Sequence, residues 1–76
     1  MTLTMYVVTN NPSDFPDHVV VRKHYVGPVE RVVDPDPMIV APELDVAREL
    51  LHAVVPGLHV IPRNRRDDPV IVESWI

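Results

Sequence analysis

Residues 41–57, which read A-P-E-L-D-V-A-R-E-L-L-H-A-V-V-P-G, form the segment of this chain with a clean helical period. Its apolar residues recur at the i, i+3, i+4, i+7 spacing and so share one stripe: Leu44, Ala47, Leu50, Leu51, Val54 and Val55. Pro42 suits the first helical position, and Pro56-Gly57 supplies the stop. Ala41 is a poor N-cap, so we expect the helix start to fray or to be held by packing.

The segment before this helix reads as strands and turns. Apolar alternation and valine-rich runs predict strands over Leu3–Thr9 and His18–Val26, joined by a turn that contains two prolines. The triplet at the start of the second strand is apolar on both faces, which indicates a central place in the sheet. Two short β-like runs, Arg31–Val33 and Met38–Val40, are separated by D-P-D-P, so we predict at least one short strand there.

Two further strands are predicted after the helix, over Leu58–Ile61, ended by Pro62, and over Val70–Ile76. A hairpin on each side of the helix follows from this order. The sequence therefore predicts one α+β domain over residues 1–76. It is a mostly antiparallel sheet of four to five strands with one helix on one face, in the order ββ(β)αββ.

Composition limits the classes of function. The 76 residues include no cysteine, which excludes disulfides, thiolate chemistry and cysteine-based metal sites. No apolar run reaches the ~18 residues of a membrane span, and the first ten residues do not resemble a signal peptide, so we expect a cytoplasmic chain without membrane contact. Seven basic against eleven acidic residues give a net charge of −4. This charge argues against a general nucleic-acid binder, although a local basic patch stays open.

No catalytic, cofactor or metal site is predicted. The two serines stand in no nucleophile motif, and both glycines adjoin prolines, which a phosphate-binding loop does not allow. The D-P-D at 34–36 lacks the glycine and the later glutamate of a calcium loop. His18 and His24 lie ~20 Å apart along one strand, too far to share a metal. A small enzyme would require a histidine and an acidic residue from separate elements to converge.

The predicted sheet has more apolar surface than its helix covers. A helix of this length, ~20 Å, covers one face, yet several strands place apolar residues on both. The uncovered face should therefore be buried by a second copy, by another protein or by the proline-rich segment 27–40. We favour a homodimer. The candidate contacts are Ile71, Val72 and Trp75, the last as an interface anchor or an ordinary core tryptophan.

A second candidate surface is the arginine-rich connection near the C-terminus. Arg63, Arg65 and Arg66 could contact phosphate or nucleic acid, above all if the fold brought them close to the basic residues 22–24. The simpler interpretation is that Asp67 and Asp68, which follow directly, neutralise the arginines.

The ending D-D-P-V-I-V-E-S-W-I (67–76) follows a helix of the P-E-L-D-V-A-R-E-L-L type and the run G-L-H-V-I-P-R. In these segments, mainly Pro42–Ile76, the chain resembles a group of small bacterial and phage proteins of unknown function. None of the shared segments is a catalytic signature, so the resemblance implies a small bacterial domain and carries over no functional residue. The sequence thus favours a non-catalytic, self-associating interaction module without cofactor. A nucleic-acid-contacting accessory protein and a small enzyme are the alternatives.

Overall fold

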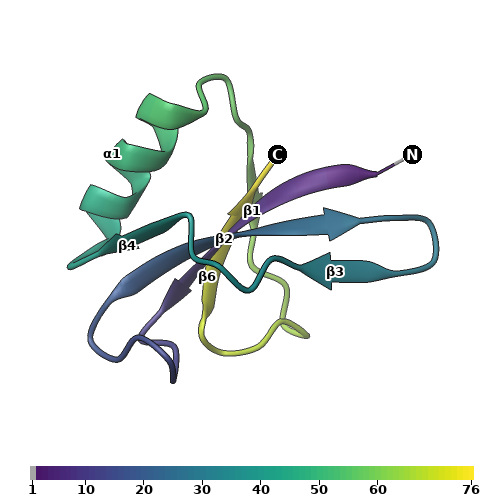
Figure 1. The fold of residues 1–76 in the computed structure, drawn as a ribbon. Coiled ribbons are helices and arrows are strands. Elements are labelled where there is room, and N and C mark those ends of the chain that lie inside the picture. The colour runs from purple at the N-terminus through teal and green to yellow at the C-terminus, as the bar shows by residue number, and fades with distance from the viewer. Residues whose placement is uncertain (1) are drawn as a thin grey trace.

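A computed structural model describes residues 2–76 and confirms the predicted fold class, one helix on a mostly antiparallel sheet (Figure 1). The elements are β1 Leu3–Asn10, β2 Val19–Val26, β3 Arg31–Val33, β4 Ile39–Ala41, α1 Leu44–Val54, β5 Val60–Pro62 and β6 Ile71–Trp75. The described sheet has six strands rather than four to five, because both short runs before the helix form strands.

The strand order is β3-β2-β1-β6-β5, and every pair in it is antiparallel. The hairpins β1–β2 and β5–β6 flank the helix along the chain, as the sequence predicts. The two eight-residue strands, β1 and β2, lie inside the sheet, where both of their edges are paired. They form the platform on which the rest of the chain is assembled.

The strands β3 and β4 lie end to end along the free edge of β2. Val33 pairs with His24 and Ile39 pairs with Val21. Val33 and Ile39 are six positions apart along the chain, whereas their partners His24 and Val21 are three apart. Residues 34–38 therefore contain three more residues than regular pairing with β2 needs, and they bulge out of the edge. The two prolines of D-P-D-P lie in this bulge. Proline has no amide hydrogen to donate, and none is needed there because the bulge is not paired with β2. Segment 27–40 therefore extends the sheet.

The helix begins later than its sequence pattern predicts. Ala41 is the last residue of β4 and Pro42 precedes the helix, so Pro42 does not occupy the first helical position. Glu43 is the N-cap, with extended backbone and no side-chain capping bond, which agrees with the expectation of a weakly capped start. The predicted stop is confirmed: the Val55 N–H bonds the Leu51 carbonyl, and Gly57 adopts a φ of +83°.

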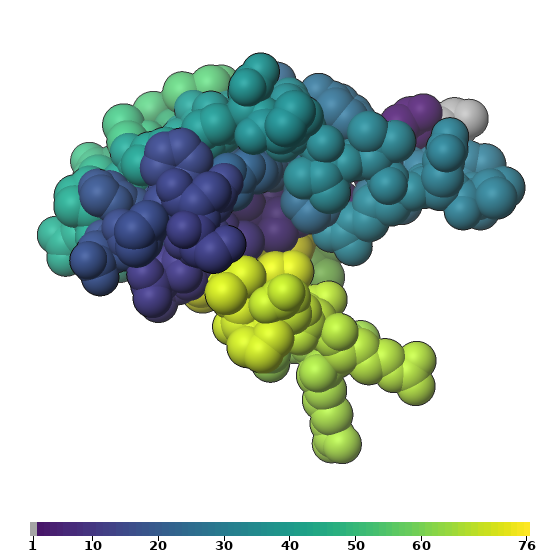
Figure 2. All heavy atoms as spheres, turned by 60° about the horizontal axis from the view of Figure 1, so that its bottom comes forward, coloured from purple at the N-terminus to yellow at the C-terminus, as the bar shows by residue number. Residues whose placement is uncertain are grey.

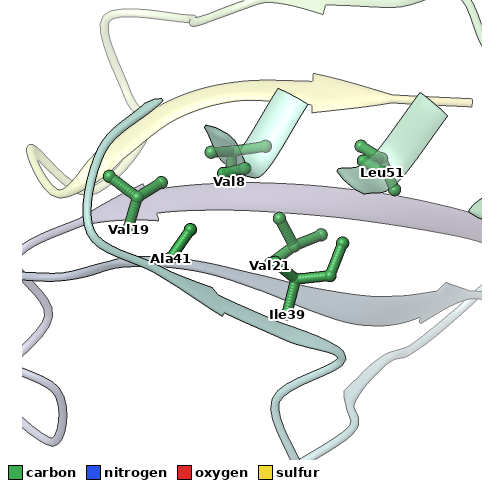
Figure 3. Close-up of a cluster of buried hydrophobic side chains, with 7 residues drawn as sticks. Val8, Val19, Val21, Ile39, Ala41 and Leu51 are labelled. Carbon is green, nitrogen blue, oxygen red and sulfur yellow. The ribbon is translucent and has the colours of Figure 1, made fainter. Parts of the chain in front are cut away.

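One hydrophobic cluster joins the helix to the sheet (Figure 3). This core cluster consists of Val8, Val19, Val21, Ile39, Ala41, Ala47 and Leu51. The helix packs mainly on β4 and β2, so its apolar stripe lies over one side of the sheet. Among residues 2–76, no helix has the length and apolar composition to cross a membrane.

Candidate functional site

An ion pair lies between the helix and β6. Glu73 is only 6% exposed, and it faces α1 because it pairs with Val8 of the core cluster. Arg48 reaches it from the helix: its Nε lies 3.2 Å from each carboxylate oxygen, and its Nη2 lies 2.5 Å from Oε1. The planar guanidinium thus holds both oxygens, the geometry that makes arginine–carboxylate pairs strong. The pair connects α1 to β6, whose Val72 and Trp75 also pack against the core cluster.

Trp75 and His52 complete this cluster. The Trp75 indole N–H donates to Glu73 Oε2 at 2.6 Å, and the His52 ring packs edge-on against Trp75 with 4.5 Å between centroids. Burial alone would raise the pKa of Glu73, but the hydrogen bonds from Arg48 and Trp75 and the charge of Arg48 outweigh it and lower that pKa. The hydrogen bond to Glu73 also raises the pKa of Arg48. Both groups therefore stay charged at neutral pH.

The face of the sheet away from α1, the open face, is half covered. Val7 and Val20 point toward it, yet they are only 1% and 0% exposed. Arg22 lies opposite Val7 on the same face, pairs with Asp14 and places its guanidinium 5.7 Å from the Phe15 ring centre. The β1–β2 connection, residues 11–18, is thereby held over this half of the face (Figure 2). This cover was not among the three that the sequence suggested.

The other half of the open face carries apolar residues that are exposed or half-buried. Strand pairing and side-chain alternation place six residues there, which we call the open-face patch: Leu3, Met5, Val26, Val33, Ile61 and Ile76. Leu3 is 50% exposed and Val33 is 47% exposed. The patch draws on β1, β2, β3 and β5 and on the residue that follows β6. Single exposed apolar residues are ordinary, whereas contiguous exposed apolar patches are typical of interaction sites.

Two histidines lie on this part of the face: His24 within the patch, and His59, which pairs with Ile76 at its edge. His24 pairs with Met5 on one side and with Val33 on the other. The Arg31 Nε donates to His24 Nδ1 at 2.9 Å, so this ring nitrogen is unprotonated. Partial burial lowers the pKa of His24, and the charges of Arg31 and Arg22 lower it further. His24 is therefore neutral at physiological pH.

The sequence-predicted contact residues do not gather on one surface. Val72 and Trp75 pack against the core cluster on the helix side, while Ile71 is half-buried and pairs with Thr9. A bulge at Val72 interrupts the pairing of β1 with β6. Of the exposed large hydrophobic residues in the described part of the chain, four gather in the open-face patch: Leu3, Val33, Ile61 and Ile76. The signal of this patch in the sequence is the alternation of Leu3 and Met5 in the first strand.

The predicted phosphate contacts Arg63, Arg65 and Arg66 all lie in the exposed β5–β6 connection. Within the described part of the chain, no hydrogen bond or ion pair joins them to the basic residues 22–24, and β1 and β6 separate β5 from β2. The two groups thus form no common basic patch. Asp67 and Asp68 also form no ion pair with Arg65 or Arg66 in the described part of the chain, and one oxygen of each carboxylate accepts a backbone N–H bond.

Residues 2–76 hold no group of three or more potential metal ligands, and no histidine there bonds a carboxylate. Comparisons of this chain with protein-family models, with curated proteins and with solved structures found no match.

We predict that the two partners of the buried pair contribute unequally to stability. Arg48→Met keeps the aliphatic stem but leaves the Glu73 carboxylate buried beside one donor, which should cost about 3 kcal/mol. Glu73→Gln should cost about 1 kcal/mol, because the amide oxygen still accepts a bond and Arg48, 41% exposed, can reach water. Urea unfolding at neutral pH measures both. An equal or larger loss for Glu73→Gln would contradict this asymmetry.

Acid should reduce the difference between the wild type and Arg48→Met. The folded pKa of Glu73 is lowered, so the stability that the pair contributes is complete above the ordinary value of 4.5 and is lost as the pH falls through the folded value. In Arg48→Met the cost of burying the Glu73 charge is opposed only by the Trp75 hydrogen bond, and protonation of Glu73 relieves this cost. Unfolding free energies measured from pH 7 down to pH 3 should therefore converge, and a constant difference would show that the Glu73 charge is not responsible.

Proposed function

We propose that this chain is a non-catalytic protein-interaction module that self-associates through the open-face patch. The supporting observation is the exposed apolar row across the strands, of which Leu3 and Val33 are the most accessible members. A chain of 76 residues buries only about 60% of its unfolded surface. Burial of such a row in a second copy adds the hydrophobic stabilisation that a small core lacks.

The edges of the sheet favour contact through the face. The edge strands β3 and β5 have three residues each, and the bulge at residues 34–38 interrupts one of these edges. Pro62 removes an N–H donor from the other. Short strands, prolines and bulges are the devices by which proteins prevent edge-to-edge pairing. Two copies therefore meet by stacking their open faces about 10 Å apart.

The charges on the open face also suit a second copy. Arg22 is 14% exposed and already paired with Asp14, and His24 is neutral as the acceptor of the Arg31 bond. Arg31 is then the one uncompensated charge that the strands place on this face, and it lies on the edge strand β3. A two-fold axis through the patch brings apolar surface against apolar surface and leaves both copies of Arg31 at the rim.

We predict that Val33→Lys abolishes self-association without loss of folding. The wild type should sediment at twice its 8.6 kDa mass and the variant at the single mass, because a lysine ammonium cannot be buried in an apolar interface. Val54→Lys is the matched control, since Val54 is 64% exposed on the far side of the sheet. Val72 is unsuitable for this test because it packs on the core cluster. A wild type that stays monomeric at high concentration would refute the proposal.

Self-association should also weaken in mild acid. Protonation of His24 removes the acceptor of the Arg31 bond and adds a charge within the patch, where Arg31 and Arg22 already face it and Met5 offers no counter-charge. Because the pKa of His24 is lowered, the dimer should persist at pH 7 and dissociate as the pH falls below 6.5.

Two variants test this pH dependence by sedimentation velocity. His24→Gln keeps an acceptor oxygen without a titrating proton and should stay dimeric in acid. His52→Gln changes an exposed histidine of α1, on the far side of the sheet from the patch, and should dissociate as the wild type does. If the dimers of all three proteins were insensitive to pH, self-association would stand, but His24 would not control it.

A further inference from the structure

The β5–β6 connection, residues 63–70, is braced by its own polar side chains. Asn64 Oδ1 accepts the Arg66 N–H at 3.1 Å, and Asp67 Oδ2 accepts the Asn64 N–H at 2.9 Å. Asp68 Oδ1 accepts the Val70 N–H at 3.1 Å. These local bonds fix the path of the backbone, as asparagine and aspartate commonly do in turns. The loop thus has a defined shape although it is exposed.

This bracing leaves two guanidinium groups without partners. Across the described residues, the Arg65 and Arg66 side chains make no hydrogen bond or ion pair, and Arg63 Nη2 donates only to the Asp67 carbonyl at 3.3 Å. Three arginines against two aspartates give the loop a surplus of one positive charge. In Figure 2 the yellow-green connection projects from the body of the molecule and carries extended side chains.

We propose that this loop binds the phosphate backbone of nucleic acid, independently of the open-face patch. Guanidinium groups match phosphate oxygens with paired N–H donors, and the braced backbone carries two of them on adjacent residues, Arg65 and Arg66. Residues 63–70 include no aromatic side chain, so the loop offers no surface for base stacking. Contact is therefore to phosphate and does not depend on base sequence.

The overall charge of −4 does not oppose this contact strongly. At physiological ionic strength the Debye length is about 8 Å, so acidic residues elsewhere on the molecule are largely screened at the projecting loop. Two phosphate contacts give a slope of about −2 for log K against log salt on duplex DNA, and about −1.4 on a single strand. Binding is therefore weak and falls about tenfold between about 50 and 200 mM salt.

The test is fluorescence anisotropy of a labelled mixed-sequence DNA duplex, and of one of its strands, titrated with the full chain. Arg65→Gln/Arg66→Gln should lose measurable binding and its salt dependence. Val29→Glu/Leu50→Glu also lowers the net charge from −4 to −6, but it alters two exposed positions outside the loop and should bind like the wild type. None of the loop's hydrogen bonds uses the Arg65 or Arg66 side chain, so this double variant should keep the wild-type unfolding midpoint.

Two results would overturn the proposal. One is the absence of any wild-type binding to either DNA at about 50 mM salt, where phosphate contacts are strongest. The other is an equal loss of affinity in the two double variants, which would show that net charge rather than the loop governs binding. Since self-association is measured separately, neither result bears on the open-face patch.

Discussion

The architecture depends on one geometric constraint: a single eleven-residue helix is too short to cover a six-stranded sheet. The helix seals the core cluster on its own side, mainly over β4 and β2. On the open face a different device is needed, and the β1–β2 connection supplies it by pairing Asp14 with Arg22 above Val7. Neither device reaches the far half of the open face, so its apolar residues stay exposed. The proposed contact surface is thus the part of the sheet that neither the helix nor the β1–β2 connection covers.

Arginine side chains have different roles in α1 and in the β5–β6 connection. Arg48 is committed to Glu73 and helps to hold the helix on the sheet, so its charge is internal to the fold. In the β5–β6 connection the acidic side chains bond backbone amides instead, and Arg65 is left without a partner among the described residues. The first arrangement stabilises the structure, whereas the second keeps positive charge available to another molecule.

The fold class was predictable because the helical period and the two long strands each show a clear hydrophobic pattern. The helix start was misplaced because Pro42 fits a strand-to-helix junction as well as a first helical position. Arg48 stands on the apolar stripe, a signal that called for a buried partner, but its pairing with Glu73 required the tertiary fold. No sequence pattern shows that Arg22 pairs with Asp14 and so holds the β1–β2 connection over the sheet. Nor does the sequence show that Asp67 accepts a backbone N–H bond rather than pairing with a neighbouring arginine, because the folded path of the loop decides which donor lies within reach.

The central claim, that the open-face patch is a contact between two copies, is tested most directly by methyl NMR spectra recorded over a dilution series. The patch contains Leu3, Val33 and Ile61, while Val54 reports on the far side of the molecule. We expect concentration-dependent shifts at the three patch methyl groups and none at Val54. Shifts that are absent at every concentration, or that centre on the helix, would contradict the claim.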